Sequence, residues 1–374
     1  MSADLTTPAY VYDLDLVSEN AREIAALLAQ AGGSYFYPLK ACSLMPVLEA
    51  VLPHVQGFEV SSLYEARLAA ELCRSSLPIH CTSPGIRPDD LRELRRYCTL
   101  FSANSLTQLI RARDVFPKEK LSLRINPEIS FVDDERYDPC RPGSKLGVPL
   151  RALEDALEEE PELAKQFSGI TLHCFCEQVD FSGLDRLIET ITPLLEAYSE
   201  HWQFLSLGGG FLFEDSVELA AIVQPLEKYK LEIAFEPGSG TVGDCATLHS
   251  RVVDLFDSGE SRIAVLDTCV NHLPEAFEYV YRYPLAEDVD PENATHHYVL
   301  AGGTCLAGDL FGKYQFDRAL AVGDCLTFGE CGAYSIVKST MFNGFSLPAI
   351  YLKKNGRLDL HRLCDYQDFH ARFK

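Results

Sequence analysis

The stretch that decides the fold is Ser34–Lys40, SYFYPLK, an aromatic and apolar run that ends in a single lysine. Such a run between turn signals predicts a buried strand. Seven further runs of this kind follow along the chain: Gly57–Ser61, Pro78–Ser83, Leu100–Asn104, Leu121–Asn126, Gly169–Phe175, Phe204–Gly208 and Leu231–Glu236. Between them lie amphipathic stretches with apolar residues at three- and four-residue spacing, such as Leu63–Cys73 and Leu184–Tyr198, which predict helices.

Eight strand–helix units fit either a closed (β/α)8 barrel or an open doubly wound sheet. The polar residues favour the barrel, because Lys40, His173 and Glu236 each close a different strand. In a barrel these strand ends surround one site, whereas an open sheet would gather its reactive residues at one crevice. We therefore expect an α/β fold with a TIM-type (β/α)8 barrel over residues 31–244.

The pattern changes after about residue 240 to short segments rich in Val, Leu, Tyr and Phe, with turn signals and no long amphipathic helix. These segments are Leu248–Phe256, Arg262–Asp267, His297–Ala301, Cys325–Phe328 and Ala349–Leu352. They predict a mainly β C-terminal domain over residues 245–374. Residues 1–30 are grouped with this domain, because the strand predicted at Ala9–Tyr12 could pair into it.

Composition excludes several classes of function. The chain of 374 residues carries 33 Lys and Arg against 55 Asp and Glu, a net charge of −22, which disfavours nucleic acids and anionic membrane surfaces as partners. The surplus acid either serves solubility or attracts a cationic substrate. Thirteen scattered cysteines without a C-x-x-C pair argue against a metal site. With no leader or membrane-spanning segment in the sequence, we expect a cytoplasmic protein.

Two strand ends carry residues suited to a phosphorylated cofactor. Burial of Lys40 at the mouth of a barrel would lower its pKa and make it a Schiff-base nucleophile, unless the side chain extends outward into water. Gly208–Gly210 would bring backbone N–H groups to a phosphate, helped by the dipole of a following helix, unless the glycines serve only the turn.

Two other strand ends add a ring partner and a carboxylate. Glu236 could pair with a protonated pyridine nitrogen, and the alternative is a solvated acid in a turn. His173 could lie against a planar ring, and the alternative is a histidine of the core. The joint occurrence of these groups with Lys40 and the glycines describes a pocket for pyridoxal 5′-phosphate.

The C-terminal half adds a thiol and a phenol in glycine-flanked segments. Cys305 lies in Gly303–Asp309, where it could donate a proton, although a buried structural cysteine is the default among thirteen. Tyr334, which follows Gly332 and Ala333, could add a hydrogen bond to a phosphate.

At this point the sequence resembles the alanine racemase-like class of pyridoxal phosphate enzymes, in the ornithine and diaminopimelate decarboxylase group. Within that group it is most similar to the carboxynorspermidine/carboxyspermidine decarboxylases. The resemblance spans nearly the whole chain, and its motifs are TPAYVYDL (7–14), YPLKA (37–41), FEVSSLYE (58–65), RINP (124–127), SKLGV (144–148), LHCFCEQ (172–178), SLGGG (206–210), FEPG (235–238), LDTCVNHLPEAFEY (266–279), GGTCLAGD (302–309), GAY (332–334) and MFNG (341–344).

The resemblance implies a role for each matched position in the cofactor site. Lys40 would bond covalently to the cofactor, His173 would stack on its ring, and Glu236 would pair with its pyridine nitrogen. The phosphate would be held by Gly209, Gly210, Gly238 and Tyr334.

The resemblance also implies a homodimer with shared active sites and a small cationic amino-acid or polyamine substrate. The partner subunit would supply Cys305 as proton donor and Asp309 as the residue that meets a substrate amine. Glu275 and Glu278 are weaker candidates to hold an amine-rich tail.

Two departures from the pattern bear on the substrate. Ser239 stands where ornithine- and diaminopimelate-type enzymes carry a phosphate-binding arginine, which argues against those substrates. Phe211–Phe213 replaces the histidines usual after the triple glycine. The resemblance implies decarboxylation to norspermidine or spermidine; the alternatives are diaminopimelate, ornithine, lysine or arginine decarboxylation, an amino-acid racemase, and an inactive homologue that holds the cofactor.

Overall fold

The computed structural model describes residues 5–74, 76–179, 181–213 and 219–374. The chain forms two compact units, here called the barrel unit (residues 18–241) and the β unit (residues 5–17 and 242–374). The sequence predicts a barrel over residues 31–244. The observed boundaries differ from this prediction mainly at α1 (Leu14–Gln30), because residues 18–30 group with the barrel unit.

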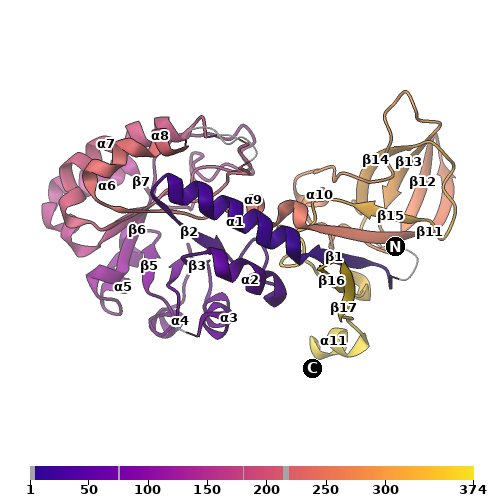
Figure 1. Cartoon of the computed structure of the whole chain (residues 1–374), viewed down its shortest axis with the longest axis horizontal. Coiled ribbons are helices and arrows are strands. Elements are labelled where there is room, and N and C mark those ends of the chain that lie inside the picture. Colours follow the sequence, from indigo (N-terminus) through magenta and orange to yellow (C-terminus); the bar gives the residue numbers. More distant parts are fainter. Residues whose placement is uncertain (1–4, 75, 180, 214–218) are drawn as a thin grey trace. The chain divides into compact units, whose positions relative to one another are not determined.

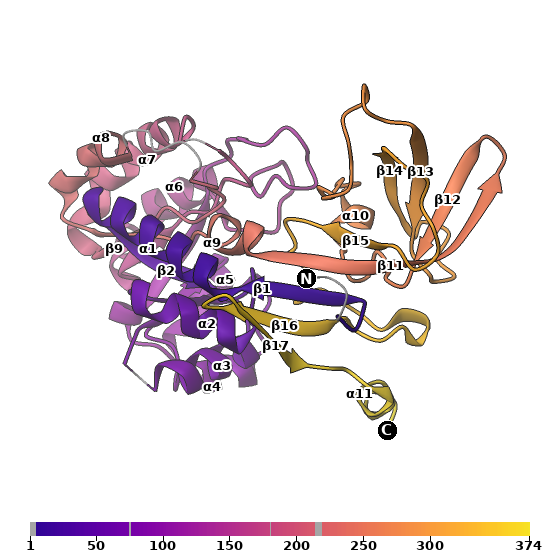
Figure 2. The same cartoon turned by 45° about the vertical axis from the view of Figure 1, so that its right-hand side comes forward.

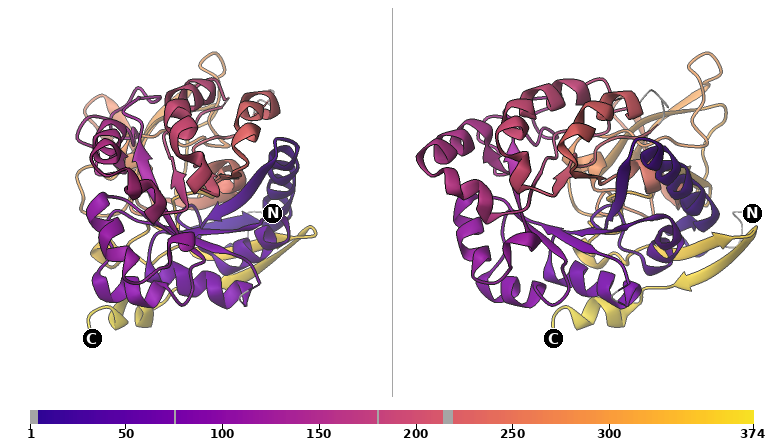
Figure 3. Two further views of the ribbon diagram at one scale, coloured as in Figure 1. Left: turned by 90° about the vertical axis from the view of Figure 1, so that its left-hand side faces the viewer. Right: turned by 60° about the vertical axis from the view of Figure 1, so that its left-hand side comes forward.

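Eight parallel strands close the barrel of the barrel unit (Figure 3). In spatial order they are β2 (Gly33–Pro38), β3 (Gly57–Val60), β4 (Ile79–Thr82), β5 (Leu100–Ala103), β6 (Leu121–Asn126), β8 (Gly169–Thr171), β9 (Phe204–Ser206) and β10 (Glu232–Phe235). The ring closes where β10 pairs with β2, with Phe235 opposite Tyr35. A short strand, β7 (Val148–Pro149), pairs with the end of β6. The TIM-type barrel predicted from the eight runs is confirmed.

Helices follow the strands around the barrel (Figure 1). They are α2 (Met45–Val51), α3 (Leu63–Cys73), α4 (Pro88–Leu94), α5 (Leu106–Arg113), α6 (Leu150–Glu159), α7 (Leu184–Tyr198), α8 (Leu219–Val223) and α9 (Ser239–Val242). Ser62 and Ser105 begin α3 and α5 by accepting hydrogen bonds from the amides of Glu65 and Gln108, which satisfies otherwise unpaired N–H groups of the first turn.

Short 3-10 turns complete the helical segments. They are η2 (Leu52–His54), η3 (Lys118–Lys120), η4 (Pro161–Gln166), η5 (Ser199–His201), η6 (Gln224–Tyr229), η7 (Gly243–Cys245) and η8 (Phe342–Gly344). Of the two units, the barrel unit contains the first five.

Aromatic side chains fill part of the barrel core. The ring of His80 stacks on Phe36 at 4.0 Å between centroids and meets Phe204 edge-on at 5.1 Å. Burial lowers the pKa of His80 to about 4, so its imidazole is neutral at pH 7 and acts as a planar packing group. These three rings lie within β2, β4 and β9, before the strands end.

The β unit is a sheet of eight strands (Figure 2). Seven run in the order β14 (Leu310–Phe316), β13 (His296–Ala301), β12 (Ser261–Leu266), β11 (Ala246–Ser258), β1 (Ala9–Asp13), β16 (Ala349–Lys354) and β17 (Arg357–Arg362), while β15 (Cys325–Phe328) pairs with β11. Tyr10 of β1 lies opposite Leu248 of β11 and Ile350 of β16. The prediction that the N-terminal strand pairs into the second domain is therefore confirmed.

Two short helices, α10 (Glu275–Glu278) and α11 (Tyr366–Ala371), complete the β unit. Strands β14 and β17 were not among those predicted from the sequence. Among the described residues, none of the helices has the length and apolar character needed to cross a membrane.

Candidate active site

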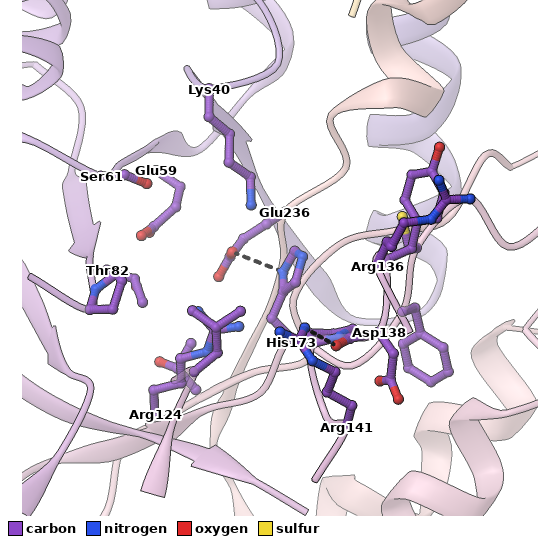
Figure 4. Close-up of a pocket in the computed structure, with 17 residues that line it drawn as sticks. Lys40, Glu59, Ser61, Thr82, Arg124, Arg136, Asp138, Arg141, His173 and Glu236 are labelled. Atoms are coloured by element: carbon purple, nitrogen blue, oxygen red, sulfur yellow. Dashed lines mark hydrogen bonds and ion pairs between the residues drawn. The ribbon is translucent and has the colours of Figure 1, made fainter. Parts of the chain in front are cut away.

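A cavity of about 320 Å³ opens where the barrel strands end (Figure 4). It is lined by Lys40, Glu59, Ser61, Thr82, Pro84, Arg124, Arg136, Tyr137, Asp138, Pro139, Arg141, Leu146, Thr171, His173, Phe175, Cys176 and Glu236. The C-terminal end of the strands is where barrel enzymes place their chemistry. Three residues singled out from the sequence, Lys40, His173 and Glu236, are brought together here.

Lys40 lies two residues beyond β2, and its side chain points into the cavity (Figure 4). It makes no hydrogen bond or ion pair with the other lining residues. Burial lowers the pKa of its amine, against the opposing charge of Glu236, and Arg124 adds to the lowering. A neutral amine is the form that attacks a carbonyl carbon, so the site favours a nucleophilic lysine.

Glu236 lies just after β10 and is almost fully buried. Its Oε1 accepts a hydrogen bond from the Ser206 hydroxyl at 2.5 Å, and its Oε2 lies 3.8 Å from Nδ1 of His173. Burial alone would raise the pKa of Glu236, but His173, Ser206 and Lys40 together lower it. The carboxyl is therefore ionised, as a partner for a protonated ring nitrogen must be.

His173 lies two residues beyond β8 and is held by the glycine turn. Its Nδ1 accepts a hydrogen bond from the Gly209 amide at 3.2 Å, which places the proton of the neutral ring on Nε2. Burial lowers the pKa of His173 to about 4, and the charge of Lys40 adds to the effect. The ring is thus uncharged at pH 7, as suits stacking against another aromatic ring.

Only glycine fits the turn after β9. Gly210 has a φ of +93°, and a Cβ there would lie 2.2 Å from the carbonyl oxygen of Phe175. A Cβ on Gly209 would lie 2.1 Å from the carbonyl oxygen of Glu236. The helix expected directly after the turn is not found in residues 211–213, so the contribution predicted for a helix dipole is not supported by the described residues.

Sequence reasoning missed two buried charged residues of the cavity, Glu59 on β3 and Arg124 on β6. Both are under 10% exposed and both line the cavity. A signal was present, because each stands inside an otherwise apolar strand, GFEV and LSLRIN. A charge in a strand that is buried on both faces needs a polar partner, and in a barrel the site is the natural place for it.

In the β unit, Cys305 and Asp309 share one turn with different surroundings. All thirteen cysteines lie within the described residues and are free, and Cys305 is the one that is exposed. The expectation that Cys305 is a buried structural cysteine is therefore wrong. Asp309 is only 3% exposed and accepts hydrogen bonds from the amides of Val270 and Thr304, at 2.8 and 2.9 Å. A contact between Asp309 and a substrate amine stays a prediction.

Glu275 and Glu278 of α10 surround one lysine of the β unit. The ammonium of Lys338 lies 3.5 Å from Glu275 and also pairs with Glu278. It lies 5.8 Å from the ring centroid of Tyr334, whose φ is +54°. Glu275 and Glu278 are therefore already paired with a cation, Lys338, within the β unit.

The barrel cavity fits pyridoxal phosphate. Lys40 has no ion pair with the other residues that line the cavity, which suits a covalent link. Ionised Glu236 suits the pyridine nitrogen, and the glycine turn leaves room for a close approach. Fold and site together define the class of barrel enzymes that depend on pyridoxal phosphate.

The chain belongs to the pyridoxal-dependent decarboxylases, since residues 14–243 match the family described as "Pyridoxal-dependent decarboxylase, pyridoxal binding domain". It is 33% identical to the carboxyaminopropylagmatine decarboxylase of Synechocystis sp. over 380 residues, 99% of this chain and 96% of that one. It is 28% identical to the carboxynorspermidine/carboxyspermidine decarboxylase of Herminiimonas arsenicoxydans, with 98% of each chain covered.

A solved structure gives the same result. The Campylobacter jejuni carboxynorspermidine decarboxylase, complexed with norspermidine, superposes with a TM-score of 0.85 at 26% identity, covering 98% of this chain and 100% of that chain. The resemblance stated from the sequence, the fold class and the pyridoxal phosphate cofactor are thereby confirmed. This chain is a pyridoxal phosphate-dependent decarboxylase.

Proposed function

We propose that the chain removes the α-carboxylate of carboxynorspermidine or carboxyspermidine and releases norspermidine or spermidine, as a step of polyamine biosynthesis. The observation that carries this proposal is the full-length similarity to decarboxylases named for these substrates, one of them solved with norspermidine. A second candidate is carboxyaminopropylagmatine, favoured by the 33% identity to the Synechocystis enzyme. All three substrates join an amino-acid head to a cationic tail.

The reaction needs an electron acceptor and a proton donor. Pyridoxal phosphate, when bound, supplies an aldehyde that condenses with amines and a protonated ring that accepts electrons. The bond between Cα and the carboxyl carbon breaks, CO₂ leaves, and a proton is added to Cα. Net uptake of one proton from solvent balances the reaction.

The barrel unit supplies the groups that hold the cofactor. Lys40 carries the amine for the covalent link, and Glu236 keeps a negative charge at the pyridine nitrogen, in a cavity where such charges act strongly. His173 presents a neutral ring for stacking. Gly209, Gly210 and Gly238 would hold the phosphate, and a role for Tyr334 of the β unit stays a prediction.

Cys305 is the proposed donor of the proton to Cα. Its exposed thiol suits contact with a substrate, and its backbone amide donates to Oδ1 of Asn343 at 2.9 Å, which fixes the turn. Asp309 would meet a substrate amine only by exchanging one of its present hydrogen bonds, or else would serve by holding the thiol-bearing turn.

Glu275 and Glu278 are proposed to attract the cationic tail. Lys338 already forms ion pairs with both carboxylates, so the substrate tail would compete with the ammonium of Lys338. This competition would favour a tail with several charges over a single amine.

The active form is proposed to be a homodimer in the cytoplasm with shared sites. Support comes from apolar side chains exposed near the Cys305 turn: Phe277, Leu310 and Phe342 are 54%, 47% and 44% exposed. A Cβ on Gly308 would lie 2.6 Å from the Phe277 ring, which ties this patch to the turn. Exposed apolar surface beside a thiol fits burial against a second copy.

The test is release of CO₂ from a panel of substrates by the protein loaded with pyridoxal phosphate. Carboxynorspermidine, carboxyspermidine and carboxyaminopropylagmatine are compared with diaminopimelate, ornithine, lysine and arginine. Turnover confined to the first two supports the proposal, and preference for the third supports the second candidate. Turnover of only the last four would contradict both, and Cα proton exchange without CO₂ release would indicate a racemase.

A further inference from the structure

The barrel cavity contains a carboxyl group that the proposed roles leave unused. Glu59 lies on β3 and is 6% exposed, and its Oε1 is buried with no hydrogen-bond partner among the described residues. Burying a polar atom without a partner is costly. A group kept at such a cost in a reactive cavity points to a function.

The fold sets Glu59 directly beside Lys40. Strand β3 pairs with β2, Glu59 lies opposite Pro38, and the carbonyl oxygen of Glu59 accepts the amide of Leu39 at 2.9 Å. The side chains of Glu59 and Lys40 extend into the same cavity (Figure 4). Two neighbouring strands thus direct into one cavity an amine and a carboxyl whose Oε1 has no partner among the described residues.

Several titratable or charged groups face Glu59 from other elements. They are Lys40 after β2, Cys98 after α4, Arg124 on β6 and Glu236 after β10, with the hydroxyl of Thr82 on β4 close by. Burial, and then the charge of Glu236, raise the pKa of Glu59 well above its ordinary value. Burial also lowers the pKa of the Lys40 amine, so the pKa values of the Glu59 carboxyl and the Lys40 amine are shifted toward each other, which favours passage of a proton between them in either direction. The pKa of Glu236 is instead lowered, which keeps that carboxyl as an electrostatic partner.

We propose that Glu59 carries the proton for Lys40, taking it when the amine bonds to the cofactor and returning it when substrate displaces the amine. In the first direction one N–H bond of the Lys40 ammonium breaks and one O–H bond forms on the Glu59 carboxylate. The neutral amine would then bond to the aldehyde carbon with loss of one water, and the reverse proton transfer restores both groups when substrate displaces the amine. The inference rests on the covalent role of Lys40 and not on the identity of the substrate.

The experiment follows the covalent link itself, without substrate. Full-length protein is freed of cofactor, pyridoxal phosphate is added, and the rate of bond formation with Lys40 is measured by absorbance from pH 6 to 9. Affinity for pyridoxamine phosphate, which has no aldehyde and cannot bond to Lys40, measures non-covalent binding in the same samples. The variant is Glu59→Gln, and the surface change Glu71→Gln on α3 is its control.

We expect Glu59→Gln to slow bond formation at pH 7 about 100-fold, the size of a lost general acid–base group. The rate in this variant should rise with pH, whereas the wild-type rate stays nearly flat, and pyridoxamine phosphate should bind equally well to both. An unchanged rate, or an equal loss of pyridoxamine phosphate binding, would overturn the inference. No covalent uptake by the wild-type protein would instead contradict the role of Lys40.

A second variant keeps the test decisive if Glu59→Gln does not fold. Glu59→Asp keeps the acid but withdraws it by one methylene, so bond formation should slow about 10-fold while its flat pH dependence is kept. A wild-type rate in Glu59→Asp, or a rate that rises with pH, would contradict a proton-carrying role.

Discussion

The hydroxyl of Ser206 donates a 2.5 Å hydrogen bond to Oε1 of Glu236 within the barrel. This bond links the ends of β9 and β10 and helps to keep a buried carboxyl ionised. Because β9 and β10 are neighbours in the barrel, the fold places Ser206 where it can stabilise the negative charge of Glu236.

Removing the Ser206 hydroxyl should weaken the ability of the cofactor ring to accept electrons, while the cofactor still binds. We expect Ser206→Ala to lower kcat about 10-fold, which corresponds to about 1.4 kcal/mol, just below the range of about 1.5–3 kcal/mol for a hydrogen bond to a charged group. Steady-state kinetics measure the change, and Ser206→Thr, which keeps a hydroxyl, is the matched control. Equal losses in both variants would assign the effect to packing.

The glycine turn should not tolerate a side chain. We expect Gly209→Ala to lower the affinity for pyridoxal phosphate at least about 10-fold, because its Cβ would lie 2.1 Å from a backbone oxygen. Gly85→Ala is the control, since a Cβ there meets nothing within 4 Å. Titration of cofactor-free protein gives both affinities, and wild-type binding by Gly209→Ala would refute the close approach.

The acid pair of α10 should act on substrate binding. Glu278→Gln removes one of two carboxylates near Lys338, so we expect KM for carboxynorspermidine to rise about 5-fold while kcat stays near wild type, because a contact with the cationic tail stabilises bound substrate and transition state equally. Glu158→Gln, on the solvent side of α6, is the control. Unchanged KM in Glu278→Gln would remove this residue from the substrate site.

Acid should destabilise the β unit through His272. The side chain is fully buried, its Nε2 has no partner among the described residues, and burial lowers its pKa to about 4. The unfolded chain therefore binds a proton first as pH falls below about 6.5, and stability is lost progressively toward pH 4.

The size of this loss follows from the shift in pKa. It amounts to about 3 kcal/mol for this one group, and urea unfolding midpoints from pH 7 to pH 4 measure it. His272→Gln should flatten the dependence, whereas exchange of the exposed His361 should not. Parallel curves for the wild type and His272→Gln would contradict the assignment.

The barrel was predictable from sequence because its strands are buried on both faces and read as continuous apolar runs. Strands β14 and β17 were missed because Gly312 and Lys313 interrupt one, and charged, largely exposed residues fill the other. Their pairing depends on neighbours far along the chain, which a local pattern does not contain.

Some residues of the candidate site were likewise predictable from the sequence, whereas others were not. Lys40, His173 and Glu236 were found because each lies at or near the C-terminal end of a predicted strand, and their convergence follows from the barrel. The exposure of Cys305 and the hydrogen bond from Val270 to Asp309, 39 residues apart, depend on tertiary folding. Glu59 and Arg124 are visible in the sequence as charges in apolar strands, but their burial in one cavity depends on the closed barrel.

The net charge of −22 can be compared with the charges that line the barrel cavity. Charged residues of both signs line the barrel cavity, where Lys40, Arg124, Arg136 and Arg141 balance the carboxylates. The acidic surplus of the chain is therefore not concentrated in this cavity.

The most direct test locates the cofactor bond. Pyridoxal phosphate-loaded protein is reduced with borohydride, which fixes the cofactor on the amine that holds it, and the digested peptides are analysed by mass spectrometry. The account predicts a phosphopyridoxyl group on Lys40 and none in Lys40→Ala. A label on another lysine, or equal labelling of Lys40→Ala, would contradict the central claim that this cavity is the catalytic site.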